Sequence, residues 1–568
     1  MSKKLLLAFY FLLSTFYLTN AQSSWQWGKR GGSSSFGSGG PDETVVDMAT
    51  DTHGNIYVLS MVMQTGLNVD GHAITGWGNH DVLISSFKCD GTYRWSKIIG
   101  SNNDDYGVAL KTDTLGGVYV TGSLYTDFVT DHIDTDTSWV SPSTSFKFLF
   151  LLKYDTAGNY KWFRMPEPDT VSIFGPGNTG AADMDVDPGG NVYLLCVLDP
   201  GAYAGGSYVV TTTGLYMLKY DKNGNFISGN PMQITGINNG FKMKRDFINS
   251  KYYITVFLNG TLSFGGTPIN HPMCIGSFNN SGIFLWQRQD TDPPSYGSSF
   301  GRPCIDGSHN IYLGGRSSPS DTFNTYAIIN GGTGTLPLAF KLDTNGNNIF
   351  AKNATVNAAT FCSTIILNGG EVDISGQYPG KLKWTGYSDS LHKGVAGYDI
   401  FITRFNATTG AVIGIDSLAS PAGTNDDATA MTSDKYGNFY VGGDFASSIT
   451  VNGTTLSSAG GGSDFFVAKY GTSNCSSPIS LETTSPDLSK GDEILRVYPN
   501  PATEELNITG IMQRTTYRLL NITGVTIQQG TFQTGANAIQ MRNCASGLYI
   551  LEMNGVDGAR NIVKVMKQ

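Results

Sequence analysis

Three acidic residues stand at equivalent positions in this chain, and they are the side chains whose type and spacing best fit chemistry. Glu43, Asp105 and Asp426 each lie 14 residues before the central residue of a phrase that repeats along the sequence. Their carboxylate oxygens could hold Ca²⁺ or accept hydrogen bonds from a glycan. Two carboxyls about 5 to 10 Å apart in a concave pocket would instead suit glycoside hydrolysis. A further alternative stays open, in which these residues are solvated in turns or bond to backbone amides at strand ends.

Other residue types with catalytic or metal-binding potential lack a supporting pattern. Of the seven histidines, His53 and His309 occupy equivalent turn positions, which is typical of turn structure rather than of metal ligation. The chain has no His-Glu-x-x-His motif and no phosphate loop. Its seven cysteines have no metal-site spacing, and a disulfide between Cys304 and Cys362 stays open. We therefore predict no catalytic residue and no cofactor, with calcium at the three carboxylates left open.

The repeated phrase decides which elements must position these carboxylates. Its central residues recur at intervals of 59 to 74 residues: Tyr57, Tyr119, Tyr193, Tyr253, Tyr312, Asp373 and Tyr440. A recurrence of this length indicates a repeat architecture. In residues 45–100, four short apolar segments alternate with turns rich in Gly, Asp and Asn. Four antiparallel strands per repeat, seven times over, predict an all-β fold, a seven-bladed β-propeller.

Aromatic residues repeat in the hairpin between the third and fourth predicted strands. The matching positions hold Trp95, Trp162, Trp286 and Phe350. We expect these large rings to fill the wedge between neighbouring blades, with a ligand-facing aromatic ladder as the alternative.

The last repeat lacks a fourth strand after its third strand, residues 464–470. The missing segment resembles residues 25–29, whose sequence Trp-Gln-Trp-Gly-Lys matches Trp-Ser-Lys at residues 95–97. We therefore predict that an N-terminal strand completes the seventh blade. Such closure removes an exposed sheet edge that would otherwise recruit other chains.

The best copy of the repeated phrase, residues 434–443, reads Asp-Lys-Tyr-Gly-Asn-Phe-Tyr-Val-Gly-Gly. Over about residues 25 to 470, the repeats resemble bacterial β-propeller repeats of the SBBP type. The fourth repeat lacks the Gly-Asn pair and the sixth has Asp373 in place of tyrosine, so these two blades fit the pattern least. The Ser-x-Asp-x-Gly-x-x-Trp turn of sialidase-like hydrolases is absent. The hairpin from Asp155 to Trp162 is similar in shape to that of quinone-dependent dehydrogenases, but the shape reflects packing and supplies no cofactor pocket.

Composition and the N-terminus predict an exported protein. Only 15% of the 568 residues are charged and 71 are glycine, which suits short strands joined by tight turns. Lys3 and Lys4, an apolar run and a small residue at Ala21 predict a signal peptide over residues 1–21. The run is shorter than the about 20 residues of a membrane span, so we expect no transmembrane span in the mature protein. Removal of the signal peptide would change the formal charge of the chain from −9 to −11. The sequence has no cluster of Lys or Arg that would indicate nucleic acid as a partner.

The C-terminal part of the chain has a different pattern. Residues 22–470 are predicted to form the propeller, and residues 471–492, rich in Ser, Thr and Pro, a flexible linker. Short alternating segments over residues 493–568 are typical of a small Ig-like β-sandwich. An ordinary accessory domain of this type is one reading of the tail.

Four motifs in the tail support a more specific reading. They are Tyr498-Pro499-Asn500-Pro501, Asn521-Ile522-Thr523-Gly524, Gly547-Leu548-Tyr549 and Lys564-Val565-Met566-Lys567. In this order they look like the type A C-terminal sorting domain of type IX secretion in Bacteroidetes. The resemblance implies a sorting signal that includes Pro499, Asn500, Pro501, Gly524, Gly547, Tyr549, Lys564 and Lys567. It also implies that the outer-membrane translocon reads the tail, which is normally removed as the protein is released or fixed to the surface.

Together these patterns predict a non-catalytic binding or scaffold module, secreted or attached to the outer surface. Its partners would be the type IX translocon and an unknown extracellular glycan or protein. The alternative is a secreted polysaccharide-active enzyme that uses the acidic rim of the propeller. A purely structural surface component is a third reading, and it predicts no defined pocket.

Overall fold

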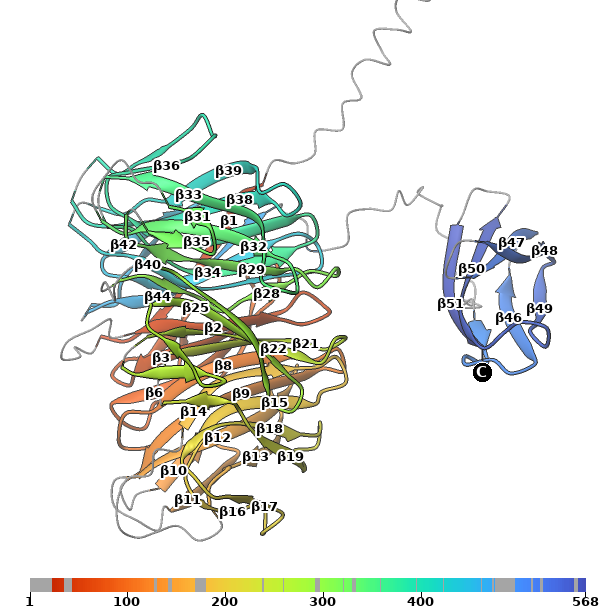
Figure 1. The fold of residues 1–568 in the computed structure, drawn as a ribbon, viewed down its shortest axis with the longest axis horizontal. Coiled ribbons are helices and arrows are strands. Elements are labelled where there is room, and N and C mark those ends of the chain that lie inside the picture. Colours follow the sequence, from red (N-terminus) through yellow and green to blue (C-terminus); the bar gives the residue numbers. More distant parts are fainter. Residues whose placement is uncertain are drawn as a thin grey trace, which may run out of the picture. The chain divides into compact units, whose positions relative to one another are not determined.

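Every regular element in the described part of the chain is a β-strand (Figure 1). The computed structural model describes residues 23–34, 43–126, 130–140, 146–168, 180–236, 240–258, 260–291, 297–319, 321–328, 334–357, 359–394, 396–421, 423–460, 462–471, 475, 496–511, 514–521, 525–555 and 560–567. The predicted signal peptide and most of the predicted linker lie outside these ranges. Within them, no helix has the length and apolar character needed to cross a membrane. The chain divides into two compact units, residues 1–479 and 480–568.

The described residues of the first unit contain seven antiparallel arrays of main strands, one per repeat, which we call sheets 1 to 7; in three of them an adjoining hairpin extends the hydrogen-bonded sheet to six or seven strands. Sheet 1 consists of β2 (Thr44–Thr50), β3 (Ile56–Met63), β6 (His80–Phe87) and β7 (Tyr93–Gly100), and sheet 2 of β8 (Tyr106–Thr112), β9 (Gly117–Thr126), β12 (Phe146–Asp155) and β13 (Tyr160–Arg164). Sheet 3 consists of β14 (Gly180–Val186), β15 (Val192–Leu198), β18 (Gly214–Tyr220) and β19 (Phe226–Pro231), sheet 4 of β21 (Phe241–Asp246), β22 (Lys251–Phe257), β25 (Met273–Asn279) and β26 (Phe284–Gln289), and sheet 5 of β27 (Ser299–Phe300) with β28 (Cys304–Ile305), β29 (Ile311–Ser317), β32 (Leu336–Leu342) and β33 (Asn348–Val356). Sheet 6 consists of β34 (Phe361–Asn368), β35 (Glu371–Tyr378), β38 (Asp399–Asn406) and β39 (Val412–Leu418), and sheet 7 of β40 (Asp427–Ser433), β41 (Phe439–Phe445), β44 (Asp464–Gly471) and β1 (Ser24–Gly32). In sheet 5 the first strand is interrupted, so β27 and β28 both pair with β29.

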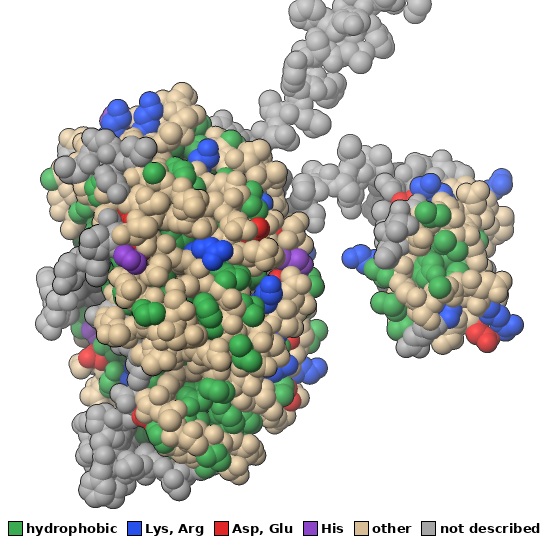
Figure 2. All heavy atoms as spheres, viewed as in Figure 1, with side chains coloured by type: hydrophobic (Ala, Val, Ile, Leu, Met, Phe, Trp, Pro, Cys, Tyr) green, Lys and Arg blue, Asp and Glu red, His purple; other side chains and the backbone are tan. Residues whose placement is uncertain are grey.

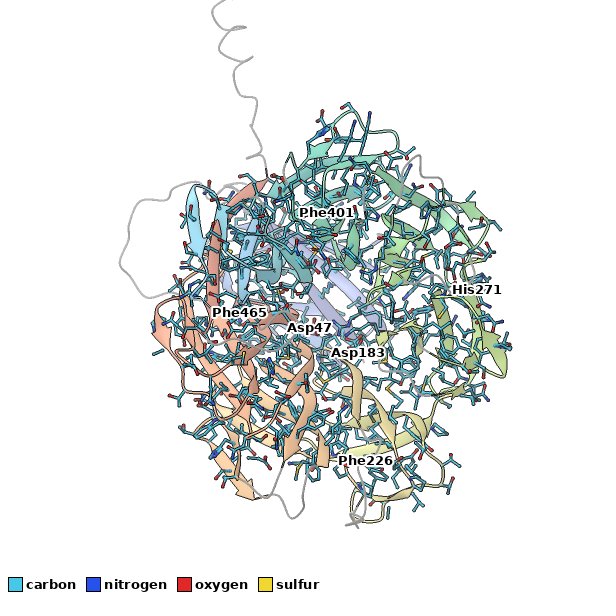
Figure 3. All side chains as sticks on the ribbon, turned by 90° about the vertical axis from the view of Figure 1, so that its left-hand side faces the viewer. Asp47, Asp183, Phe226, His271, Phe401 and Phe465 are labelled. Carbon is cyan, nitrogen blue, oxygen red and sulfur yellow. A yellow bond between two sulfur atoms is a disulfide. The ribbon has the colours of Figure 1, made fainter. Side chains whose placement is uncertain are left out.

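The first strands of consecutive sheets touch one another from β2 to β40, and β40 in turn touches β2. The N-terminal strand β1 pairs antiparallel with β44, from Ser24 opposite Gly471 to Gly31 opposite Phe465. Segments from both ends of the first unit therefore share one sheet. Figure 3 shows the sheets around a common centre, with Asp47 and Asp183 beside it.

The apolar core lies between neighbouring sheets. On the side facing sheet 2, Tyr57 of sheet 1 belongs to a buried cluster with Val118 and Phe150. The next residue, Val58, belongs to a different cluster, with Tyr440 of sheet 7. Successive side chains of a strand point to opposite faces, so each apolar strand fills both of its interfaces at once. This explains why these strands are nearly continuous apolar runs.

One turn explains the repeated phrase. The Asp51 carboxylate accepts hydrogen bonds from the Asn55 amide (2.9 Å), the Asn55 side chain (2.7 Å) and the Tyr57 hydroxyl (2.9 Å). The aspartate thus satisfies turn donors that a strand ladder cannot reach. The hydroxyl of the repeat's own tyrosine is bonded in the same way by Asp113, Asp306 and Asp434. The phrase therefore encodes a structural turn.

The aromatic residues of the outer strands lie between sheets, as the sequence predicted. Each indole N–H donates to a carbonyl oxygen in a turn of the next sheet: Trp27 to Cys89 (2.9 Å), Trp95 to Thr156 (3.1 Å), Trp162 to Lys222 (3.0 Å) and Trp286 to Thr344 (3.1 Å). The glycine two residues later in that turn packs against the ring. At Gly158, whose φ is +82°, a Cβ atom would lie 2.8 Å from the Trp95 ring. We name this contact the indole–turn lock.

Four strands per repeat was an incomplete prediction, because each repeat also inserts a short hairpin between its second and third strands. These hairpins are β4 (Asn68–Val69) with β5 (His72–Ala73), β10 (Thr130–Ile133) with β11 (Thr137–Val140), β16 (Gly201–Tyr203) with β17 (Tyr208–Val210), β23 (Leu262–Phe264) with β24 (Thr267–Ile269), β30 (Thr322–Phe323) with β31 (Tyr326–Ala327), β36 (Lys381–Trp384) with β37 (Leu391–His392), and β42 (Ser448–Val451) with β43 (Thr454–Ser457). Three of them pair with the outer strand of the preceding sheet, β4 with β1, β10 with β7 and β36 with β33. β23 pairs with β20 (Ile234–Thr235), which follows β19. Four of the seven hairpins therefore pair with the outer strand of the preceding sheet or with the strand that follows it, and the other three form separate two-stranded sheets.

The disulfide considered from the sequence is not formed, and a different one is. Cys304 and Cys362 are free thiols. Cys89, in the turn between β6 and β7, is instead bonded to Cys475, which follows β44. The chain beyond β44 thus returns to sheet 1, an approach that cysteine spacing alone does not reveal. The bridge joins residues 386 positions apart in sequence.

The second unit contains two antiparallel sheets in its described residues. One has the order β45 (Arg496–Tyr498), β46 (Glu505–Ile511), β49 (Gly535–Gln540), and the other β48 (Thr526–Phe532), β47 (Thr515–Asn521), β50 (Gly547–Gly555), β51 (Arg560–Lys567). Leu506 and Ile539 of the first sheet share one buried cluster with Leu519 and Leu551 of the second. Two sheets around one core form a small β-sandwich.

Candidate functional site

The three predicted carboxylates occupy equivalent places, but all three are buried. Glu43 is 1% exposed, and Asp105 and Asp426 are 0% exposed. Each accepts a hydrogen bond from the backbone amide 20 residues later: Glu43 from Met63 (3.1 Å), Asp105 from Tyr125 (2.8 Å) and Asp426 from Ala446 (3.1 Å). These amides lie at or just beyond the end of the second strand in their sheets. The structure thus places the residues in the strand-end role that the sequence had left open.

Burial governs the protonation of these carboxyls. It raises the pKa of Glu43 to about 7, that of Asp105 to about 8 and that of Asp426 to about 6, although amide hydrogen bonds act in the opposite direction. Within the described residues, no hydrogen bond or ion pair joins any two of the three. Side chains buried and separately bonded in this way do not present a shared group of oxygens to a ligand.

A cavity of about 540 Å³ lies instead where the first strands meet. Its wall includes residues from the first strand of every one of the seven sheets, among them Asp47, Lys111, Asp185, Lys242, Arg302 and Thr364. A volume of this size is within the range of small-molecule sites, about 300 to 1,000 Å³. We name it the central cavity.

Arg302 crosses the central cavity and links three sheets. It lies between β27 and β28, in the interruption of the first strand of sheet 5. Its guanidinium donates to Asp47 of sheet 1 (Nη1 to Oδ1, 2.8 Å) and to Asp183 of sheet 3 (Nε to Oδ2, 3.0 Å). Although burial opposes ionisation, the charge of Arg302 holds the pKa of both aspartates below their usual range. Figure 3 shows Asp47 and Asp183 close together near the centre.

Asp47 and Asp185 line the cavity and Asp183 lies beside it, bonded to Arg302, and each carboxylate oxygen of the three already has two polar partners. Asp47 accepts hydrogen bonds from Met48 N, Leu110 N, Lys111 Nζ and Arg302. Asp183 accepts hydrogen bonds from Met184 N, Met243 N and two nitrogens of Arg302. Asp185 accepts hydrogen bonds from Val186 N and Arg245 N, and Lys244 Nζ contacts both of its oxygens. Three acidic residues therefore face four basic ones. The fourth base, Lys242, has no hydrogen-bonding or ion-pair partner in the described part of the chain, and burial lowers its pKa.

The opposite wall of the cavity is uncharged. Sheets 6 and 7 contribute Thr364, Ile365 and Ile366 together with residues 429–432, which are Thr, Ala, Met and Thr. The central cavity thus combines a cationic side with a largely apolar side. Such a combination suits a small ligand that has one anionic end.

Sequence reasoning missed these cavity residues, although a signal was present. Asp47 and Asp183 both stand 10 residues before their anchor tyrosine, inside otherwise apolar first strands. Strand pairing shows that Lys242 occupies the equivalent position in its own repeat. Each of Asp47, Asp183 and Lys242 lies opposite the residue that follows the repeat's central tyrosine by two positions. Charged residues aligned on a repeat inside buried strands would have indicated a polar axis.

No metal centre was found within the ranges that the structure describes, where no group of three or more His, Cys, Asp or Glu side chains could hold an ion. His309 pairs with Asp246 (2.9 Å) rather than with another histidine. On the face drawn in Figure 2, charged side chains are few and scattered.

The predicted sorting motifs meet at one end of the second unit. Asn500 donates from its side chain to the Lys564 carbonyl (2.7 Å) and accepts from the Met566 amide (2.9 Å). Tyr549 lies opposite Asn521 on one side and Val565 on the other. Pro499 and Pro501 follow cis peptide bonds, and Gly547 begins β50 opposite Lys567. Gly524 lies outside the described residues.

Comparison with known families identifies the second unit. Residues 496–568 match the secretion system C-terminal sorting domain. This confirms the sorting domain predicted from the four motifs. The protein is exported across both membranes by type IX secretion, and it is secreted or attached to the outer surface.

Comparisons of the rest of the chain are less informative. One relative, an uncharacterized WD repeat-containing protein of Acanthamoeba polyphaga mimivirus, is 29% identical over 129 residues, which cover 21% of this chain and 9% of that protein. Among solved structures, PorZ, a surface component of the type IX secretion system of Porphyromonas gingivalis, is 11% identical with a TM-score of 0.23, covering 92% of this chain and 81% of that one. The quinohemoprotein alcohol dehydrogenase ADHIIG of Pseudomonas putida HK5 is 10% identical with a TM-score of 0.32, covering 83% and 80%. Scores this low carry no argument about function.

Proposed function

We propose that this protein is a non-catalytic binding or scaffold module delivered by type IX secretion. The module is a seven-bladed β-propeller of SBBP-type repeats, closed by the N-terminal strand after a signal peptide over residues 1–21 has been removed. The pairing of β1 with β44 and the contact between β2 and β40 support this closed ring. The mature module binds an extracellular glycan or protein and carries no resident cofactor.

One observation carries the non-catalytic reading. Glu43, Asp105 and Asp426, on which the enzymatic alternative depended, are buried, and each is bonded to its own strand-end amide. A glycoside hydrolase needs two accessible carboxyl groups that flank the scissile bond. The three residues therefore support the sheets and leave the binding role to loops and cavities.

Insoluble polysaccharides offer a direct test of this proposal. The exported protein is incubated with cell-wall and plant polysaccharides, and both retained protein and new reducing ends are measured. Retention without new reducing ends is the expected result. New reducing ends that disappear in the folded variant Asp105→Asn would contradict the proposal, because they would give Asp105 a catalytic role.

A calcium requirement can be separated in the same experiment. The buried carboxylates are expected to bind no Ca²⁺, so retention should be unchanged by EDTA. Loss of retention in EDTA, with recovery on added Ca²⁺, would restore the calcium hypothesis and direct mutation to Glu43, Asp105 and Asp426.

A further inference from the structure

Within the described residues, the central cavity contains one basic side chain, Lys242, that has no hydrogen-bonding or ion-pair partner. Lys242 lies on β21, and among the carboxylates Asp183 raises its pKa most, although burial lowers that pKa more strongly. Both oxygens of Asp183 already accept two hydrogen bonds each, from Met184 N, Met243 N and Arg302. In the described part of the chain, no carboxylate is therefore paired with Lys242.

Lys242 is half-buried, and partial desolvation of an unpaired cation costs free energy that a pairing anion partly recovers. Arg302, Lys111 and Lys244 line the same cavity as Lys242. These four positive charges exceed the three negative charges of Asp47, Asp183 and Asp185, so the electrostatic potential in the cavity is positive. The rest of the protein is acidic, with a formal charge of −9 for the whole chain. The positive cavity is thus a local exception that general composition does not explain.

The uncharged wall restricts which anion fits. Ile365, Ile366 and Met431 line the side contributed by sheets 6 and 7. A fully hydrated inorganic ion would leave this wall in contact with water, whereas an alkyl or aromatic group would cover it. The cavity volume of about 540 Å³ accommodates a molecule of this kind.

We propose that the central cavity binds a small amphipathic carboxylate, with the carboxylate on Lys242 and the apolar part against Ile365, Ile366 and Met431. This goes beyond the proposed function, which assigns no ligand to the cavity. The recognised class is a monocarboxylic acid with an apolar chain or ring. A ring-shaped protein with such a site would carry a small molecule in addition to its surface partner.

Calorimetric titration of the exported protein with octanoate at pH 7 tests the proposal. Wild type should bind one equivalent saturably, Lys242→Met should lose at least tenfold in affinity, and Lys242→Arg should retain most of it. Lys161→Met is the control, since Lys161 lies outside the cavity and pairs with Asp155 (2.8 Å), and it should bind as wild type does. Circular dichroism and thermal unfolding of each variant show whether it is folded.

Two comparisons separate the parts of the proposal. Acetate should bind at least tenfold more weakly than octanoate, and equal affinity would overturn the role of the apolar wall. Neutral octanamide should bind weakly and independently of Lys242. No saturable binding of octanoate, or equal affinity in folded Lys242→Met, would overturn the site. Because polysaccharide retention is measured separately, failure here leaves the proposed surface-binding function standing.

Discussion

The carboxyls of Glu43, Asp105 and Asp426 are each held by a backbone amide at the end of a strand. The repeat alignment correctly placed Glu43, Asp105 and Asp426 as equivalents, and the shared bond to an amide 20 residues later shows why they recur. Their burial could not be read from the sequence. The sequence pattern of a polar residue beside a turn is the same when the loop is solvated and when it folds back onto the second strand.

Asp290 and Asp321 form a buried pair whose titration is testable. Burial and the charge of Asp321 raise the pKa of Asp290 to about 8. The native state therefore keeps a proton that the unfolded chain loses near pH 4, so this pair's contribution to stability falls as pH rises from about 4 to 8. The Asp290→Asn side chain is uncharged at every pH. The variant's free energy of unfolding relative to wild type should rise between pH 5 and pH 9 by at least about 1.4 kcal/mol, the equivalent of one pKa unit.

Urea unfolding at pH 5, 7 and 9 measures this difference. Asp221→Asn is the control, because the pKa of that exposed hairpin carboxyl lies below its usual range and no titration of it falls in this window. A constant difference between Asp290→Asn and wild type across the three pH values would show that Asp290 is ionised in the native protein.

At the scale of elements, the indole–turn lock should contribute stability beyond the turn itself. Gly158 and Gly437 occupy the same Asp-x-x-Gly-Asn turn, with φ of +82° and +87°, but only Gly158 lies against an indole. Gly437→Ala should cost about 1 kcal/mol through backbone conformation alone. Gly158→Ala should cost a further 1 to 3 kcal/mol, roughly the penalty of overpacking against Trp95.

Denaturant unfolding of the two variants compares these costs directly. The repeats make the comparison well matched, since turn sequence and backbone angle are shared. Equal losses for Gly158→Ala and Gly437→Ala would mean that the indole moves aside at little cost and that the lock is not a main source of cohesion between sheets.

Much of the element pattern could be predicted from the sequence, and the omissions have physical reasons. The period and the apolar runs indicated the main strands of the repeat, most clearly the second and third strands, which are buried on both faces. The inserted hairpins were missed because their strands are only two to four residues long. The turn pairs Asp70-Gly71 and Asn452-Gly453, with positive φ at all four residues, were the available signal.

For the whole molecule, the Cys89–Cys475 bridge should stabilise the first unit considerably. It fastens the chain beyond β44 to sheet 1 and closes a loop of 386 residues. Replacement of both cysteines by serine should lower the free energy of unfolding by about 2 to 5 kcal/mol. Wild type unfolded in the presence of a thiol reductant should match the double variant. A midpoint shared by oxidised wild type and the double variant would show that strand pairing alone holds this end of the unit.

The central claim is that the exported protein binds an extracellular partner without transforming it. The most direct measurement is a glycan and surface-protein array probed with the protein collected after export, with and without EDTA, followed by mass analysis of the bound ligands. The account predicts saturable binding that is insensitive to EDTA and leaves the ligand's mass unchanged. Ligands of altered mass, or no binding to any arrayed partner, would contradict it.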